Sequence, residues 1–123
     1  MSKDYAQALH DFWSGFGLTA YDENSVPDDA RMPYITYSVV TDSLEYIALL
    51  TGSVWYRETT WENASQKAEH ISASLKNGII IKLDKGYVYL YRGTPFAQRM
   101  GDETDDMIKR VYFNVNAEYL TDE

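Results

Sequence analysis

Two segments of the chain carry apolar residues at the spacing of an amphipathic helix. One helix is predicted over residues 3–16, with Ser2 as a candidate N-cap. The other is predicted over residues 60–76, after Thr59-x-x-Glu62, which is typical of a capping box. The apolar faces consist of Tyr5, Leu9, Phe12, Trp13 and Phe16 in the first helix, and of Trp61, Ala64, Ala68, Ile71 and Leu75 in the second.

Elsewhere the hydrophobic pattern alternates or forms short apolar runs between turn signals. It predicts strands at residues 34–41, 46–57, 79–83, 87–91 and 107–120. Asp42-Ser43 can turn the chain between the first two strands. Thr51-Gly52-Ser53 predicts a bulge or bend within the second strand. The last strand is long enough to pair with more than one neighbour.

Residues 22–33 and 92–106 are predicted to be irregular, because proline, glycine and polar turn formers gather there. The length of 123 residues suits a single domain, residues 1–123. The predicted fold class is α+β, with two helices packed on a mostly antiparallel sheet of about five strands. Such a sheet has edges, and an edge left unpaired in a monomer is a template for another chain.

Composition and charge exclude several classes of protein. The chain has no cysteine, which excludes disulfides and thiolate metal sites. Its net charge is −8, and Lys109-Arg110 is too small a basic cluster for a protein that grips nucleic acid. The N-terminus lacks the apolar region of a signal peptide, and no apolar run approaches the length of a membrane span.

Candidate catalytic and metal-ligating residues are few. His10 and His70 have no partner nearby in the sequence at metal-binding spacing, so a position at the surface or at the border of the core is favoured for each. The acidic clusters lack the alternating ligands of a calcium loop and are interpreted as solvated loops. No nucleophile elbow or phosphate-binding loop is present. The sequence therefore predicts neither an enzyme nor a cofactor or metal site.

The segment 92–106 contains the residue types that dominate protein interfaces, namely Arg92, Phe96 and Arg99. Loops of this length in small domains are usually functional or disordered. Two interpretations stay open: the segment orders against a neighbouring subunit, or it is a mobile surface loop.

Several segments resemble the tail terminator and head–tail joining proteins of long-tailed bacteriophages. These segments are Pro33-Tyr34-Ile35-Thr36-Tyr37, Ser53-Val54-Trp55-Tyr56, the central helix with Ala64, Ala68 and Ile71, Gly93 to Met100, and Met107 to Tyr112. The resemblance covers most of the chain, and the order of elements carries much of it.

The resemblance implies a structural protein of the virion tail or neck, made in the host cytoplasm. Such a protein forms a ring, typically a hexamer, that caps the tail tube protein and meets the head connector or stopper protein. DNA passes through the lumen without specific binding, and no membrane is involved. The charge of −8 fits a lumen that repels DNA.

A cyclic ring places one patch of each subunit against a different patch of the next. We expect the two patches to be acidic and basic respectively. The basic candidates are Arg57, Arg92 and Arg99, with Phe96 beside them. The acidic candidates are Asp28, Asp29, Asp102, Glu103, Asp105 and Asp106.

Three other interpretations remain at this point. The chain could be another neck or minor capsid protein of the same fold. It could be an acidic inhibitor that mimics DNA, which the net charge favours and the interspersed basic residues disfavour. A small enzyme with an unrecognised site has no support in the sequence.

Overall fold

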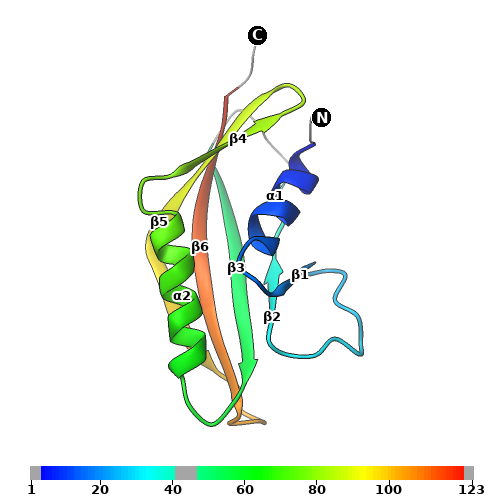
Figure 1. The fold of residues 1–123 in the computed structure, drawn as a ribbon, viewed down its shortest axis with the longest axis vertical. Coiled ribbons are helices and arrows are strands. Elements are labelled where there is room, and N and C mark those ends of the chain that lie inside the picture. The colour runs from blue at the N-terminus through cyan, green and yellow to red at the C-terminus, as the bar shows by residue number, and fades with distance from the viewer. Residues whose placement is uncertain (1–3, 41–46, 121–123) are drawn as a thin grey trace.

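The computed structural model describes residues 4–40 and 47–120. The elements follow in the order α1 (Tyr5–Ser14), β1 (Thr19–Asp22), β2 (Tyr34–Tyr37), β3 (Ala48–Arg57), α2 (Glu62–Ser74), β4 (Ile79–Leu83), β5 (Gly86–Gly101) and β6 (Ile108–Leu120). The strands form a six-stranded sheet in the order β1-β2-β3-β6-β5-β4. Figure 1 shows both helices on the same side of this sheet. The candidate N-cap Ser2 and the candidate turn Asp42-Ser43 lie outside the described residues.

The predicted fold class is wrong in its sheet. Two helices are present, but the sheet has six strands, is mixed, and curls into a half-barrel. It is mixed because β1 pairs with β2 in parallel, whereas the other neighbours are antiparallel. Strands make up 47% of the described residues, so the protein is more β-rich than predicted. The curl brings β4, at one edge, close to α1, which also contacts β1 and β2 near the other edge.

β5 explains most of the difference. Residues 92–101 belong to this strand, and only the following turn is irregular. The register between β5 and β6 shifts between Arg92 and Ala97, and Pro95 lies within this bulge. A bulge tolerates proline because the ladder hydrogen bond is already interrupted there. The prediction of an irregular segment at 92–106 therefore holds only for its last residues.

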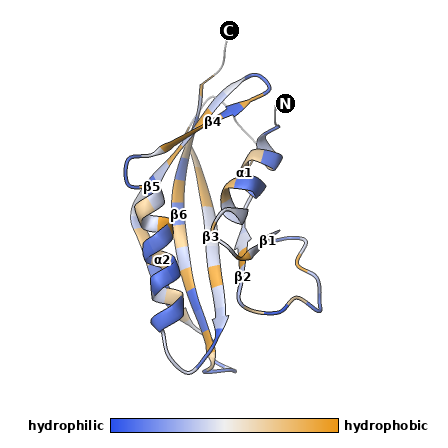
Figure 2. Cartoon of the chain, viewed as in Figure 1, coloured by the Kyte–Doolittle hydropathy of each residue, from blue (hydrophilic) through white to orange (hydrophobic). Residues whose placement is uncertain are grey.

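The core lies between the helices and the sheet, as the periodicities predict. Leu9, Trp13 and Phe16 of the α1 region are buried, as are Ala64 and Ile71 of α2 and Leu75 at its C-cap. In β6 the buried residues alternate with half-buried ones from Lys109 to Ala117, which confirms the predicted alternation. Figure 2 shows this as alternating hydrophobic and hydrophilic colour along β6.

Two local predictions are wrong, one in β3 and one at the start of α2. The register of β3 with both neighbours is continuous, so Thr51-Gly52-Ser53 is not a bulge. A Cβ on Gly52 would lie 2.6 Å from the Trp13 ring, so this glycine makes room for α1. The N-cap of α2 is Trp61 and makes no side-chain cap hydrogen bond, so Thr59 does not form a capping box.

Tyr5 of α1 and Tyr119 of β6 pack edge to face, with ring centroids 4.8 Å apart. Both hydroxyls are buried beside each other. Burial raises the pKa of both side chains, because the phenolate is poorly solvated there.

This pair predicts a loss of stability in alkali. A group whose pKa is higher in the folded chain stabilises fully below its unfolded pKa, about 10 for tyrosine, and that stability is lost as the pH rises above it. We expect the urea midpoint to fall between about pH 9 and pH 11. In Tyr5→Phe/Tyr119→Phe the urea midpoint should fall clearly less over this pH range than in the wild type. The control is Tyr21→Phe, on the face of the sheet without helices, in which the midpoint should fall as much as in the wild type. An equal fall in the double variant would contradict the expectation.

Candidate assembly surfaces

One face of the sheet carries no helix of the described chain, and apolar side chains gather on it. Four large side chains there are strongly exposed: Leu49 (71%), Ile80 (63%), Leu120 (49%) and Tyr87 (40%). Tyr89 and Tyr91 are half-buried beside them and stack with ring centroids 5.0 Å apart. The strand register places these residues in adjacent cross-strand rows. We call this set (Leu49, Ile80, Tyr87, Tyr89, Tyr91 and Leu120) the outer patch.

A second cluster lies further along the same face. The guanidinium of Arg110 lies over the rings of Trp55 and Tyr112, at 4.4 and 5.4 Å from their centroids. Its Nε donates to Ser53 Oγ at 2.9 Å. The indole N–H of Trp55 donates to Thr36 Oγ1 at 2.9 Å. This cluster is not evident from the sequence, because cross-strand register, and not sequence distance, brings β2, β3 and β6 together here.

Arg57 and the acidic turn after β5 lie at the same end of the sheet. Arg57 Nε and Asp105 Oδ2 form an ion pair at 3.1 Å, with both side chains partly exposed. This pair is exposed enough that its contribution to stability is about 0–1 kcal/mol. Within one subunit Arg57 thus faces the 102–106 turn, so the pair is already formed before any neighbour arrives.

The turn itself is organised by Asp102. Its Oδ1 accepts hydrogen bonds from the N–H groups of Thr104 and Asp105, at 2.8 and 3.1 Å, and from the Thr104 hydroxyl at 2.7 Å. These hydrogen bonds lower the pKa of Asp102, because they stabilise its charged form. Glu103 and Asp106 are exposed, and the Asp106 carbonyl accepts from Lys109 Nζ. The Asp102 carboxylate therefore shapes this turn.

The other predicted interface residues lie apart from this turn. Arg92 donates to Ser72 Oγ at 3.0 Å and Arg99 to Ser65 Oγ at 2.9 Å, both serines belonging to α2. Arg99 also lies 5.1 Å from the centre of the Trp61 ring. Phe96 is half-buried and packs on Phe113, with centroids 5.3 Å apart, so it belongs to the edge of the core.

Asp28 and Asp29 are exposed in the loop between β1 and β2, next to the β1 edge of the sheet. The two arginines of β5 and this acidic loop therefore occupy opposite sides of the six-stranded sheet. Figure 1 shows the loop extending away from β2, on the side remote from β5.

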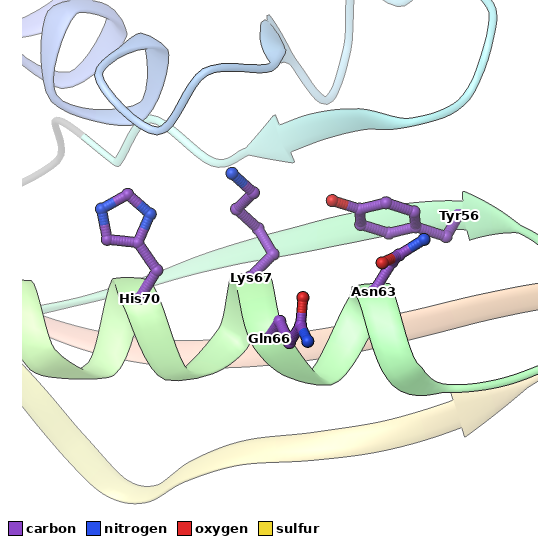
Figure 3. A pocket seen from close by; sticks show the side chains of 5 residues that line it. All are labelled: Tyr56, Asn63, Gln66, Lys67 and His70. Carbon is purple, nitrogen blue, oxygen red and sulfur yellow. The ribbon is translucent and has the colours of Figure 1, made fainter.

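A hollow of about 240 Å³ lies beside α2 and is lined by Tyr56, Asn63, Gln66, Lys67 and His70 (Figure 3). Lys67 Nζ donates to the Phe16 carbonyl at 2.6 Å, and the His70 ring packs against Phe16 at 5.2 Å. These two contacts connect α2 to the segment that follows α1. Burial, followed by the nearby Glu58 charge, raises the pKa of Tyr56.

The histidines lie at the surface, as predicted. His10 Nδ1 lies 3.1 Å from the Tyr37 hydroxyl, and His10 Nε2 lies 3.4 Å from Ser14 Oγ. Among the described residues no three His, Asp or Glu side chains gather in a group that could hold a metal ion. Neither described helix is long and apolar enough to cross a membrane.

Comparison with known proteins yields no match to a family model, to a curated protein or to a solved structure.

Proposed function

We propose that this chain is a virion structural protein of a long-tailed bacteriophage, a tail terminator. In this proposal it forms a ring that caps the tail tube and joins it to the head connector. The segments that carry the sequence resemblance support it. Pro33 directly precedes β2, Ser53 to Tyr56 lie in β3, and Met107 to Tyr112 span the start of β6.

The outer patch is the observation that carries the proposal. A sheet face without helices normally buries its apolar side chains against another layer or leaves mainly polar ones in water. Here Leu49 and Ile80 are the most exposed large apolar residues of the described chain, and they lie on that face with three tyrosines. Aromatic and apolar residues gathered on an exposed surface are typical of protein interfaces.

The charge of the chain is consistent with DNA passing nearby without being held. A net charge of −8 repels phosphates, and the described basic side chains do not form a continuous stripe. Arg57 is paired with Asp105, Arg110 lies over aromatic rings, and Lys67 is bonded to a carbonyl. A ring of such subunits would present a surface along which DNA slides.

The function is tested by adding the purified protein to tail tube protein of the same virion while it polymerises. The wild type should stop tube growth and be found at one tube end by electron microscopy. Ile80→Lys, which places a charge in the outer patch, should reduce this capping at least about tenfold, if the lost contact costs about 1.4 kcal/mol or more. The matched control is Ser74→Lys, at an exposed position of α2, and it should cap normally.

Unchanged tube growth with the wild-type protein would contradict the terminator function. Binding to a nuclease or polymerase instead would favour the acidic inhibitor. Normal tube growth in vitro together with headless, correctly sized tails in a deletion phage would favour another neck protein.

A further inference from the structure

Both edges of the six-stranded sheet include strand segments whose outer side has no partner strand among the described residues. β1 pairs only with β2, over Thr19–Asp22. On the other side, β4 pairs with β5 only as far as Leu90, whereas β6 pairs with β5 as far as Gly101. Among the described residues, the part of β5 beyond Tyr91 therefore has a neighbouring strand on one side only, and Figure 1 shows β4 confined to one end of the sheet.

Both edges have backbone groups available for pairing. On β1, the Asp22 carbonyl already accepts from Ser25 N–H at 2.9 Å, and no other backbone group has a partner on the outer side among the described residues. On β5, Pro95 within the bulge blocks pairing, but residues Ala97 to Gly101 are regular, exposed and without a partner on the outer side in the described chain. Such stretches are templates for a strand of another chain.

Over the stretches that would pair, the two edges carry opposite charge, although the acidic turn Asp102 to Asp106 directly follows Gly101 of β5. The β1 edge is flanked by Asp22 and Glu23, with Asp28 and Asp29 in the following loop. The β5 edge carries Arg92 and Arg99, which are exposed and bonded only to neutral serine hydroxyls and an aromatic ring among the described residues. Neither arginine is in an ion pair there, so both charges are available to a partner.

This arrangement favours contact between unlike edges. Two β5 edges brought together would oppose Arg99 with Arg99, and two β1 edges would oppose their carboxylates. A β1 edge against a β5 edge places unlike charges together and fixes partner orientation. Because the two edges differ, the contact is heterologous: it does not stop at a dimer, and it forms a ring where the rotation between neighbours closes.

We propose that copies of this chain join edge to edge, with β1 of one copy pairing alongside Ala97 to Gly101 of the next. The sheets of neighbouring subunits then continue into one another around the assembly. The inference rests on the proposed function in one respect, namely that the chain assembles with itself. It adds which strands meet and which charges select them.

The absence of cysteine allows a direct test by cross-linking. Thr19 in β1 and Gln98 in β5 are exposed and lie on the same face of the sheet by register. When Thr19→Cys and Gln98→Cys are mixed under assembly conditions and oxidised, the mixture should give a disulfide-linked dimer. Each variant alone should not, and a mixture of Thr19→Cys with Ser74→Cys, on α2, should not.

Charge reversal gives the second measurement. Arg99→Glu should weaken assembly at least about tenfold, the loss expected when one charge of a close pair is reversed. Adding Glu23→Lys in the same chain should restore much of the loss. The control Lys85→Glu makes the same charge change in the exposed β4–β5 turn and should assemble normally.

The outcomes separate this inference from the proposed function. If the mixture of Thr19→Cys and Gln98→Cys forms normal oligomers but gives no disulfide-linked dimer, and Arg99→Glu assembles as the wild type does, edge pairing is overturned while ring assembly stands. Protein that stays monomeric, alone and with tail tubes, would overturn both.

Discussion

Trp13→Ala is expected to lower the free energy of unfolding by about 3–5 kcal/mol, the range for deleting a buried aromatic side chain. The Trp13 side chain is 1% exposed, and its ring contacts Phe12, Phe16 and Phe113. Its removal leaves a cavity between α1 and the middle of the sheet. Since small domains are stable by about 5–15 kcal/mol, much of the total is lost.

The measurement is urea unfolding followed by far-UV circular dichroism. The matched control is Phe12→Ala, in the same helix at a half-buried position, which should cost clearly less. A loss for Trp13→Ala no larger than that for Phe12→Ala would show that α1 does not pack on the sheet as described.

Gly52→Ala is expected to destabilise the protein by about 1–3 kcal/mol through overpacking. A single added methyl would lie 2.6 Å from Trp13 Cη2, and both residues are buried in the middle of the fold. Because the ring is enclosed, the clash is relieved only by moving α1 or β3. Gly101→Ala is the control, since nothing lies within 4 Å of a Cβ at that position.

The two substitutions should also be coupled. In Trp13→Ala/Gly52→Ala the ring that causes the clash is gone, so the loss should be smaller than the sum of the two single losses by about 1 kcal/mol or more. Urea unfolding of all four proteins measures this. Additive losses, or a neutral Gly52→Ala, would contradict the close approach of Trp13 to β3.

The sequence predicted best where a periodic pattern coincides with one buried face. The apolar stripe of α1 and the alternation of β6 were both confirmed, because a helix or strand that buries one face repeats that face along its length. Trp13 could be assigned to the core in this way. The contact of the Trp13 ring with Gly52 could not be predicted from the sequence, because it depends on which strand lies beneath α1.

The errors arose where tertiary pairing overrides a local signal. Gly93 and Pro95 are breakers by sequence, but β6 holds the chain extended on both sides of the bulge. β1 has only four residues and pairs in parallel at an edge, so it has no alternation long enough to detect. Trp61 lies beneath Arg99, and α2 begins after it without the predicted capping box.

The candidate surfaces could be predicted only in part. Arg92, Arg99, Asp28 and Asp29 were identified from residue type, and the structure places them on opposite sides of the sheet. Arg57 and Asp105 are 48 residues apart, so their pairing follows from the β3–β6 register, which the sequence does not encode locally. The outer patch was missed for the same reason, since its members come from four strands.

The central claim is that this chain assembles with itself on the end of a tail tube. The most direct test is the molar mass of the purified protein by light scattering, alone and with assembled tail tubes. From the proposed ring assembly we expect a closed oligomer, typically a hexamer, in at least one of the two conditions. A 14.2 kDa monomer in both, with no binding to tubes, would contradict it.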